Sequence, residues 1–198
     1  SRYDGPIKIG IKNYVFHTGV EGHMIDLIAA IYSAIHSGCR VINLSLGYPS
    51  NSINPILRDA IAYAGDSAND CVVVCAAGNN ASDNDVHGYW PANFNHMDHV
   101  ITVAAADDSG HLWVSGQGRG SNYGEINVQT ASPGVDILGH FNSTNVGTLT
   151  GTSSAAAVLS AYATTLRAQS LQMSASEIVQ TILSQRNNPS VSQVMMPQ

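Results

Sequence analysis

Apolar residues along this chain form short continuous runs, separated by stretches in which apolar residues recur every three to four positions. A continuous run of four to eight residues is typical of a β-strand that is covered on both faces in a parallel sheet. Such runs predict strands over residues 41–47, 71–77 and 99–106. An alternating apolar pattern predicts a further strand over residues 7–11.

The stretches with helical spacing predict helices over about residues 23–37, 55–64 and 153–168, and from about residue 175 onward. Gly38 is placed to end the first, Asn54 to cap the second, and Ser174 with Glu177 to form a capping box before the last. Strands that alternate with helices predict a three-layer α/β domain, with a mainly parallel sheet flanked by helices. No linker or internal repeat divides the chain, so we expect residues 1–198 to form one domain.

Composition and charge narrow the classes of partner. Of the 198 residues, 44% are apolar and 11% are charged, which is enough apolar material for a sizeable core. The formal net charge is −6, so we expect no basic patch for nucleic acid. No apolar run approaches the roughly 20 residues that span a membrane, so we expect no membrane partner either.

The chain has three cysteines, Cys39, Cys71 and Cys75. The last two lie on one predicted strand, roughly 13 Å apart at about 3.3 Å per residue, which is too far for a disulfide. At most one disulfide is therefore possible, through Cys39. Buried free thiols are the favoured interpretation.

The stretch from Gly147 to Leu159 brings a serine to the start of a helix whose first turns consist of small residues. Unpaired backbone N–H groups lie at a helix start, and small residues allow the helix to be deeply buried. Ser153 in Gly151-Thr152-Ser153 is therefore a candidate nucleophile. On this stretch alone, an ordinary N-cap by Thr152 or Ser153 explains the pattern equally well.

A second stretch favours the nucleophile. The apolar run that begins at Cys71 continues through Ala76-Ala77-Gly78 into Asn79. The two stretches together resemble the subtilisin-like serine proteases, whose nucleophile lies in G-T-S-x-A and whose oxyanion asparagine lies in A-A-G-N. The resemblance implies a subtilisin-like fold, Ser153 as the nucleophile and Asn79 as a donor to the oxyanion.

The resemblance also implies where a peptide substrate would bind. Residues 22–47 resemble the family's helix and the strand that ends in N-x-S-L-G, after which the backbone pairs with an extended substrate. The substrate-binding candidates are therefore Ser45, Leu46 and Gly47, with Gly22 flanking the peptide on the other side. Ala76, Ala77 and Gly78 would form the wall of a pocket in which their small size leaves room for a bulky side chain. Tyr89-Trp90-Pro91-Ala92 resembles the family's Y-P-A segment near that pocket.

Two family motifs are absent. The family's triad runs Asp, His, Ser along the chain, with the aspartate in D-[ST]-G and the histidine in H-G-T-H, and neither motif occurs here. His17, His23 and Asp4 are poor substitutes, because none lies in a matching context. The chain thus resembles the last two-thirds of a catalytic domain and lacks the N-terminal part. We expect a companion polypeptide to carry the triad Asp and His, and a protein or peptide to be the substrate.

Further expectations concern metal ions, cellular location and nucleotides. His87, His96, Asp98 and His99 match no zinc signature, so we predict a solvated loop rather than a metal site. The resemblance allows a structural calcium and favours a secreted or extracytoplasmic location. Gly116–Gly120 lacks the strand–turn–helix context of a nucleotide site. The alternative to an enzyme is a catalytically incompetent, protease-like binding module.

Overall fold

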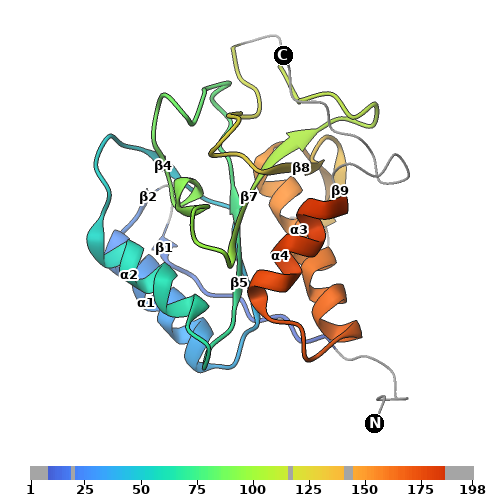
Figure 1. Ribbon diagram of the computed structural model, residues 1–198. Coiled ribbons are helices and arrows are strands. Elements are labelled where there is room, and N and C mark those ends of the chain that lie inside the picture. Colours follow the sequence, from blue (N-terminus) through green and yellow to red (C-terminus); the bar gives the residue numbers. More distant parts are fainter. Residues whose placement is uncertain (1–8, 19–20, 116–117, 141–144, 186–198) are drawn as a thin grey trace.

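A parallel sheet forms the centre of the molecule, in a computed structural model that describes residues 9–18, 21–115, 118–140 and 145–185 (Figure 1). Its strands lie in the order β3 (Val41–Leu44), β5 (Val72–Ala76), β7 (Val100–Ala106) and β8 (Thr130–Pro133). All positions of β5 and β7 are buried, as their continuous apolar sequences predict. Leu44 lies opposite Cys75 in the register of β3 and β5. The segments that follow these two strands therefore emerge side by side at one edge of the sheet.

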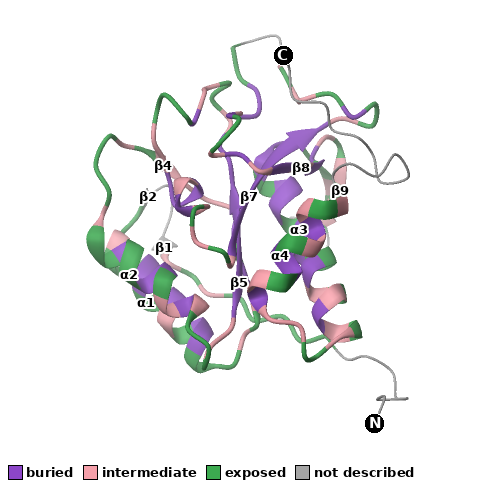
Figure 2. Cartoon of the chain, in the orientation of Figure 1, coloured by how far each residue is buried: buried purple, intermediate pink, exposed green. Residues whose placement is uncertain are grey.

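Helices cover both faces of the sheet. On one face lie α1 (Met24–His36) and α2 (Pro55–Gly65), and on the other lie α3 (Thr152–Gln169) and α4 (Ala175–Gln185) (Figure 1). Successive residues of β5 face opposite layers: Val73 packs in the cluster with α1 and α2, and Val74 in the cluster with α3 and α4. Figure 2 shows the buried positions concentrated on the sheet and on the helix sides turned toward it. The predicted three-layer α/β architecture is confirmed.

Local sequence signals set the helix starts. Asn54 caps α2, its Oδ1 accepting from the backbone N–H groups of Ile56 and Leu57. Ser174 and Glu177 form the predicted capping box before α4, because each side chain accepts a hydrogen bond from the other residue's backbone N–H. The remaining elements are β1 (His17–Thr18), β2 (Glu21–Gly22), β4 (Tyr48–Pro49), β6 (Tyr89–Trp90), the 3-10 helix η1 (Ala92–Phe94), β9 (Ile137–His140) and β10 (Val146–Leu149).

Two predicted strands differ from the structure. Residues 9–11 are not a strand, and residues 7 and 8 lie outside the described residues. Ile9 and Ile11 are 53% and 85% exposed, and within the described part of the chain no strand pairs with them to satisfy their backbone. The second predicted strand, 41–47, ends at Leu44, because residues 45–47 leave the sheet.

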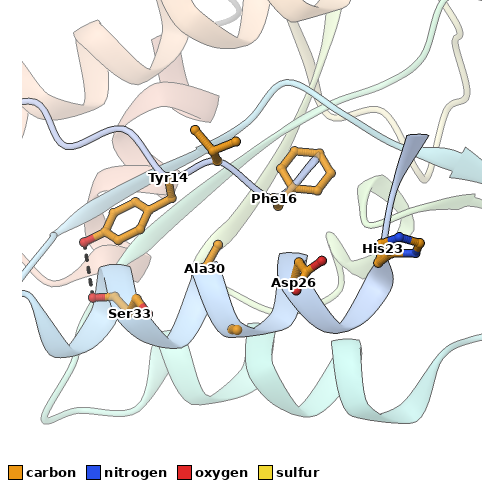
Figure 3. A pocket seen from close by; sticks show the side chains of 8 residues that line it. Tyr14, Phe16, His23, Asp26, Ala30 and Ser33 are labelled. Carbon is orange, nitrogen blue, oxygen red and sulfur yellow. Dashed lines mark hydrogen bonds between the residues drawn. The ribbon is translucent and has the colours of Figure 1, made fainter. Parts of the chain in front are cut away.

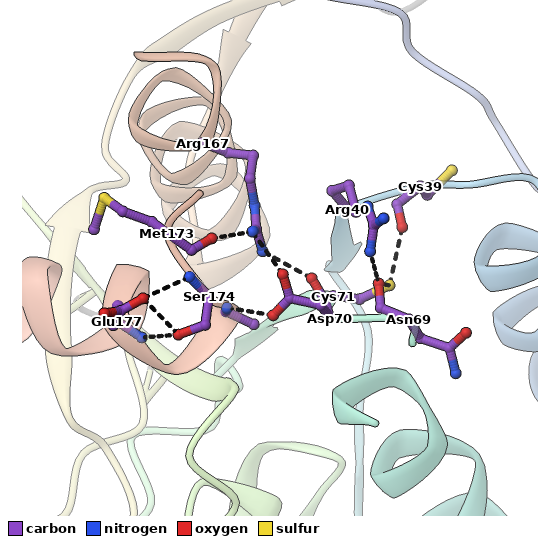
Figure 4. Close-up of polar contacts among 10 residues, drawn as sticks. Cys39, Arg40, Asn69, Asp70, Cys71, Arg167, Met173, Ser174 and Glu177 are labelled. Carbon is purple, nitrogen blue, oxygen red and sulfur yellow. Dashed lines mark hydrogen bonds and ion pairs between the residues drawn. The ribbon is translucent and has the colours of Figure 1, made fainter. Parts of the chain in front are cut away.

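A partly buried ion pair ties α3 and α4 to the start of β5 (Figure 4). The Arg167 guanidinium donates to the Asp70 carboxylate at 2.7 Å and to the Asp70 carbonyl at 2.7 Å. The N–H of Ala175 donates to the other carboxylate oxygen of Asp70 at 2.6 Å. Partial burial alone would raise the pKa of Asp70, but these donors and the charge of Arg167 outweigh it and hold the pKa below its usual value.

The three cysteines are free thiols, as expected. Cys71 and Cys75 are buried, whereas Cys39 is half-buried. Burial raises the pKa of Cys71 to about 11 and raises that of Cys75 further, so both stay protonated at neutral pH. Among the described helices, none has the length and apolar character that crossing a bilayer requires.

Candidate active site

The start of α3 presents one serine to solvent. Thr152 and Ser154 are 1% and 8% exposed, and Ala155 and Ala156 are fully buried, but Ser153 between them is exposed. The small residues let α3 lie against β3, β5, β7 and β8. Gly151, just before the helix, has a φ of 139°, a conformation that favours glycine. The sequence thus builds a buried helix start on which only the candidate nucleophile faces outward.

Ser153 lies against the end of β3. The Ser153 hydroxyl donates to the Ser45 carbonyl at 3.1 Å, and the Ser45 hydroxyl donates to the Ser153 carbonyl at 2.8 Å. The Asn43 side chain donates to the Ser45 hydroxyl at 2.9 Å and accepts from the Ser160 hydroxyl at 3.2 Å. This reciprocal pair and its support fix the backbone of α3 relative to the segment Ser45–Gly47.

Asn79 is held beside the same helix start. Its Oδ1 accepts from the Thr152 backbone N–H at 2.9 Å and from the Thr152 hydroxyl at 3.0 Å. The Thr152 hydroxyl in turn accepts from the backbone N–H of Gly78 at 3.2 Å. Because Oδ1 is turned toward Thr152, the amide nitrogen of Asn79 faces the other way. Within the described residues this nitrogen has no hydrogen-bond acceptor, so it is available to a ligand.

Buried asparagines fix the segment around Asn79. Asn84 and Asn122 are each 1% exposed. Asn84 donates to the Ala77 carbonyl at 3.0 Å, and Asn122 donates to Asn84 at 3.0 Å and accepts from the backbone N–H of Asn80 at 2.8 Å. A fully bonded buried network of this kind rigidifies the backbone that it joins. Sequence reasoning missed Asn84, which lies in a polar loop without a periodic signal.

The two predicted substrate-binding segments lie side by side, and a tyrosine ring occupies the space between them. Ala77 is fully buried and Ala76 is 3% exposed, so neither side chain offers surface to a ligand. A Cβ built on Gly47 would lie 2.3 Å from Tyr89 Cε1, and one on Gly78 would lie 2.8 Å from Tyr89 Cζ. The ring of Tyr89 therefore lies against both glycines, between the two segments. The substrate-binding roles of these residues and of Leu46 stay predictions.

Gly22 and His23 belong to other parts of the described structure, the β1–β2 hairpin and the start of α1. Gly22 is exposed and pairs with His17 in the β1–β2 hairpin, and among the described residues no hydrogen bond links it to Ser153 or Asn79. His23 lies at the start of α1, where it helps to line a hollow of about 320 Å³ (Figure 3). The other residues of this hollow are Tyr14, Val15, Phe16, Asp26, Ala29, Ala30 and Ser33. In the part of the chain that the structure describes, no histidine bonds to the Ser153 hydroxyl, and Asp4 lies outside that part.

The histidine-containing loop does not gather metal ligands. His99 packs against α2, where its Nε2 lies 2.9 Å from the Ile61 carbonyl. Burial lowers the pKa of His99, outweighing the opposing effect of this hydrogen bond. His96 interacts with the Asn93 carbonyl instead. Among the described residues, no group of three or more His, Cys, Asp or Glu side chains is placed to hold a metal ion.

This arrangement of a serine at a helix start, with an asparagine clamped beside it, agrees with a comparison of the chain with known families. The subtilase family model matches residues 8–194. The chain belongs to the subtilase family, and the predicted membership is confirmed.

Individual relatives place the chain within that family. It is 35% identical over 149 residues to a thermophilic serine proteinase of Bacillus sp. (strain AK1), covering 75% of this chain and 33% of the relative. It is 30% identical over 176 residues to subtilisin DY of Bacillus licheniformis, covering 88% of this chain and 59% of the relative. The chain therefore spans less than two-thirds of the length of either relative.

Solved structures of proteases share the fold. The prenylagaramide maturation protease PagA superposes with a TM-score of 0.70 at 25% identity, covering 88% of this chain and 62% of that one. The self-cleaved protease domain of PatA superposes with a TM-score of 0.67 at 27% identity, covering 81% of this chain and 58% of that one. The subtilisin-like fold expected from the sequence is confirmed.

Proposed function

We propose that this chain carries the nucleophile and the oxyanion donors of a serine endopeptidase that hydrolyses peptide bonds through an acyl-enzyme on Ser153. The observation that carries the proposal is the clamp of Thr152 on Asn79. It holds the asparagine oxygen on the side of the helix start, and so leaves the amide nitrogen free beside the only exposed residue of the first turn. An asparagine amide donates a hydrogen bond without adding a charge, which suits a developing oxyanion.

The reaction follows from these positions. The Ser153 oxygen attacks the carbonyl carbon of the scissile bond while its proton passes to a base, and the carbonyl oxygen becomes an oxyanion. The oxyanion accepts hydrogen bonds from Asn79 Nδ2 and from the backbone N–H of Ser153 at the positive end of α3. Collapse expels the amine, which takes the proton from the base. Water then attacks the acyl-enzyme by the same steps and releases the acid.

The base that we propose lies outside the described residues. The Ser153 hydroxyl donates to the Ser45 carbonyl, and a backbone carbonyl is far too weakly basic to take a proton from a serine. We infer that a histidine oriented by an aspartate, both on a companion polypeptide, takes the place of this contact. This is the arrangement of the family's triad.

Uncovered surface supports a companion. Among the described residues, β3 pairs with a strand on one side only. Apolar side chains upstream of β3 are also exposed, with Val15 at 82% and Ile25 on α1 at 67%. An unpaired strand edge and exposed apolar side chains are the features that another piece of a parallel α/β domain would cover.

Peptide hydrolysis by the natively purified assembly that contains this chain tests the proposal. We expect Ser153→Ala to abolish cleavage and Ser154→Ala, one residue away and buried, to leave it intact. An intact mass spectrum of the same material under denaturing conditions should show a second polypeptide with D-[ST]-G and H-G-T-H motifs. Hydrolysis that survives Ser153→Ala would refute the proposed nucleophile. A spectrum with this chain alone, together with no hydrolysis, would favour the binding module.

A further inference from the structure

The ring of Tyr89 lies between the two segments for which substrate binding is predicted. The segments Ser45–Gly47 and Ala76–Gly78 follow neighbouring parallel strands, so they emerge together next to Ser153. The phenol ring of Tyr89 contacts both, at Gly47 and at Gly78. A Cβ at either glycine would stand 2.3 Å or 2.8 Å from ring atoms, closer than van der Waals contact allows. The two glycines therefore make room for the ring, and the ring fills the room.

The backbone that carries the ring is fixed from several directions. Tyr89 pairs with Pro49 through the β4–β6 bridge, and its N–H donates to the Asn93 side chain at 3.3 Å. The neighbouring Trp90 is 8% exposed, packs on Phe94 with ring centroids 4.6 Å apart, and donates from its indole N–H to the Ser50 carbonyl at 3.0 Å. Tyr89 thus stands on a supported strand rather than on a free loop, which keeps its ring in the space between the two segments.

Burial raises the pKa of Tyr89, so the phenol is neutral at physiological pH and adds no charge to this space. A ring in this position shortens any side-chain pocket between the two segments. A large aromatic or aliphatic side chain would have to displace a ring whose backbone is held in place, whereas a hydrogen, methyl or hydroxymethyl group would not.

On the basis of the proposed function, we propose that Tyr89 determines specificity. It closes the substrate side-chain pocket, so the enzyme cleaves after small residues such as Gly, Ala or Ser. The substrate class is then a peptide with a small side chain on the acyl side of the scissile bond.

The test compares peptides that differ only at that residue, Ala against Phe, with the active assembly. We expect the kcat/KM of the natural protein to favour Ala by about 100-fold, within the roughly 10–200-fold that even one extra methylene is worth in a hydrophobic pocket. Tyr89→Gly should raise kcat/KM for Phe at least tenfold and collapse the preference. Tyr89→Phe keeps the ring and should keep the preference.

The outcomes separate the two proposals. Ser153-dependent cleavage after Phe as fast as after Ala overturns the role of Tyr89 and leaves the peptidase standing. The same holds if Tyr89→Gly is active and keeps the Ala preference. If no peptide is cleaved in a Ser153-dependent way, both proposals fall. The kcat/KM ratio of the natural protein for the Ala and Phe peptides tests the inference without any variant. The test therefore stands even if Tyr89→Gly does not fold.

Discussion

The Thr152 hydroxyl is expected to contribute to turnover although it does not touch the substrate. Thr152→Val keeps the branched shape of a residue that is 1% exposed and removes only the hydroxyl. Asn79 Oδ1 then loses one of its two donors and keeps the Thr152 N–H at 2.9 Å. The backbone N–H of Gly78 loses its acceptor at 3.2 Å. The substitution thus loosens the oxyanion donor and leaves one buried N–H unpaired.

The unpaired N–H lowers the free energy of unfolding, and the lost hydrogen bond to Asn79 lowers kcat. The unpaired N–H costs about 1–3 kcal/mol of unfolding free energy. The lost hydrogen bond to Asn79 is worth about 1 kcal/mol, and if that loss is expressed in the transition state, kcat falls by roughly 5- to 10-fold. A ceiling comes from losing the asparagine altogether, about 10²–10³ in turnover, a value measured on a subtilisin of this same family.

Steady-state kinetics and thermal unfolding of the assembly measure the two effects separately. We expect Thr152→Val to lower kcat with little change in KM, because the oxyanion exists only in the transition state. Thr152→Ser keeps the hydroxyl and should lose much less. A Thr152→Val protein with the kcat of Thr152→Ser, or one that changes KM alone, would refute the positioning role.

The remaining predictions concern the oxyanion donor, the helix start and the ion pair. Asn79→Ala should lower kcat by about 10²–10³ with KM nearly unchanged, the magnitude again being that known from a subtilisin, and an unchanged kcat would remove Asn79 from the site. Gly151→Ala places a Cβ at a φ of 139° and 3.1 Å from Asn79 Oδ1, so we expect lower stability by about 1–3 kcal/mol together with lower kcat; a gain in melting temperature would contradict this. Asp70→Ala removes the carboxylate partner of Arg167 and leaves its guanidinium only the backbone carbonyls of Asp70 and Met173. Since the Asp70 side chain is 26% exposed, we expect the lower end of the cost of a broken buried pair, about 3 kcal/mol of unfolding free energy at neutral pH, measured by denaturant titration. The pKa of Asp70 is lowered in the folded protein, so its carboxylate stabilises the fold above its unfolded pKa of about 3.9. This stabilisation is lost as the pH falls through the folded pKa. A cost of Asp70→Ala that stays the same in acid would contradict this reasoning.

The sequence predicted the layers of the fold and the caps of its helices because these depend on local patterns. The apolar run of β5 and the helical spacing in α1 are short-range signals, and Asn54 and Ser174 cap helices through neighbours two or three residues away. Residues 9–11, the described part of the strand expected over residues 7–11, are not a strand for the opposite reason. A strand requires a partner for its backbone, and no pattern within the segment states whether that partner is present.

The same distinction applies to the site. Ser153 and Asn79 lie in motifs that could be recognised from the residues alone. The ring of Tyr89 could not be placed, because its contacts with Gly47 and Gly78 join segments that are distant in sequence and depend on the β4–β6 bridge. The small side chains of Ala76, Ala77 and Gly78 predict a pocket, and this prediction stays open. The sequence could not show that a ring from another segment lies beside Gly78.

The nucleophile itself is tested most directly by labelling the native assembly with a fluorophosphonate and locating the adduct by peptide mass spectrometry. An activated serine beside an oxyanion hole should react at Ser153, the adduct should disappear in Ser153→Ala and persist in Ser154→Ala, and prior denaturation should prevent it. An assembly that contains the companion polypeptide yet leaves Ser153 unlabelled, or that carries the adduct on another serine, would contradict the proposed role of Ser153.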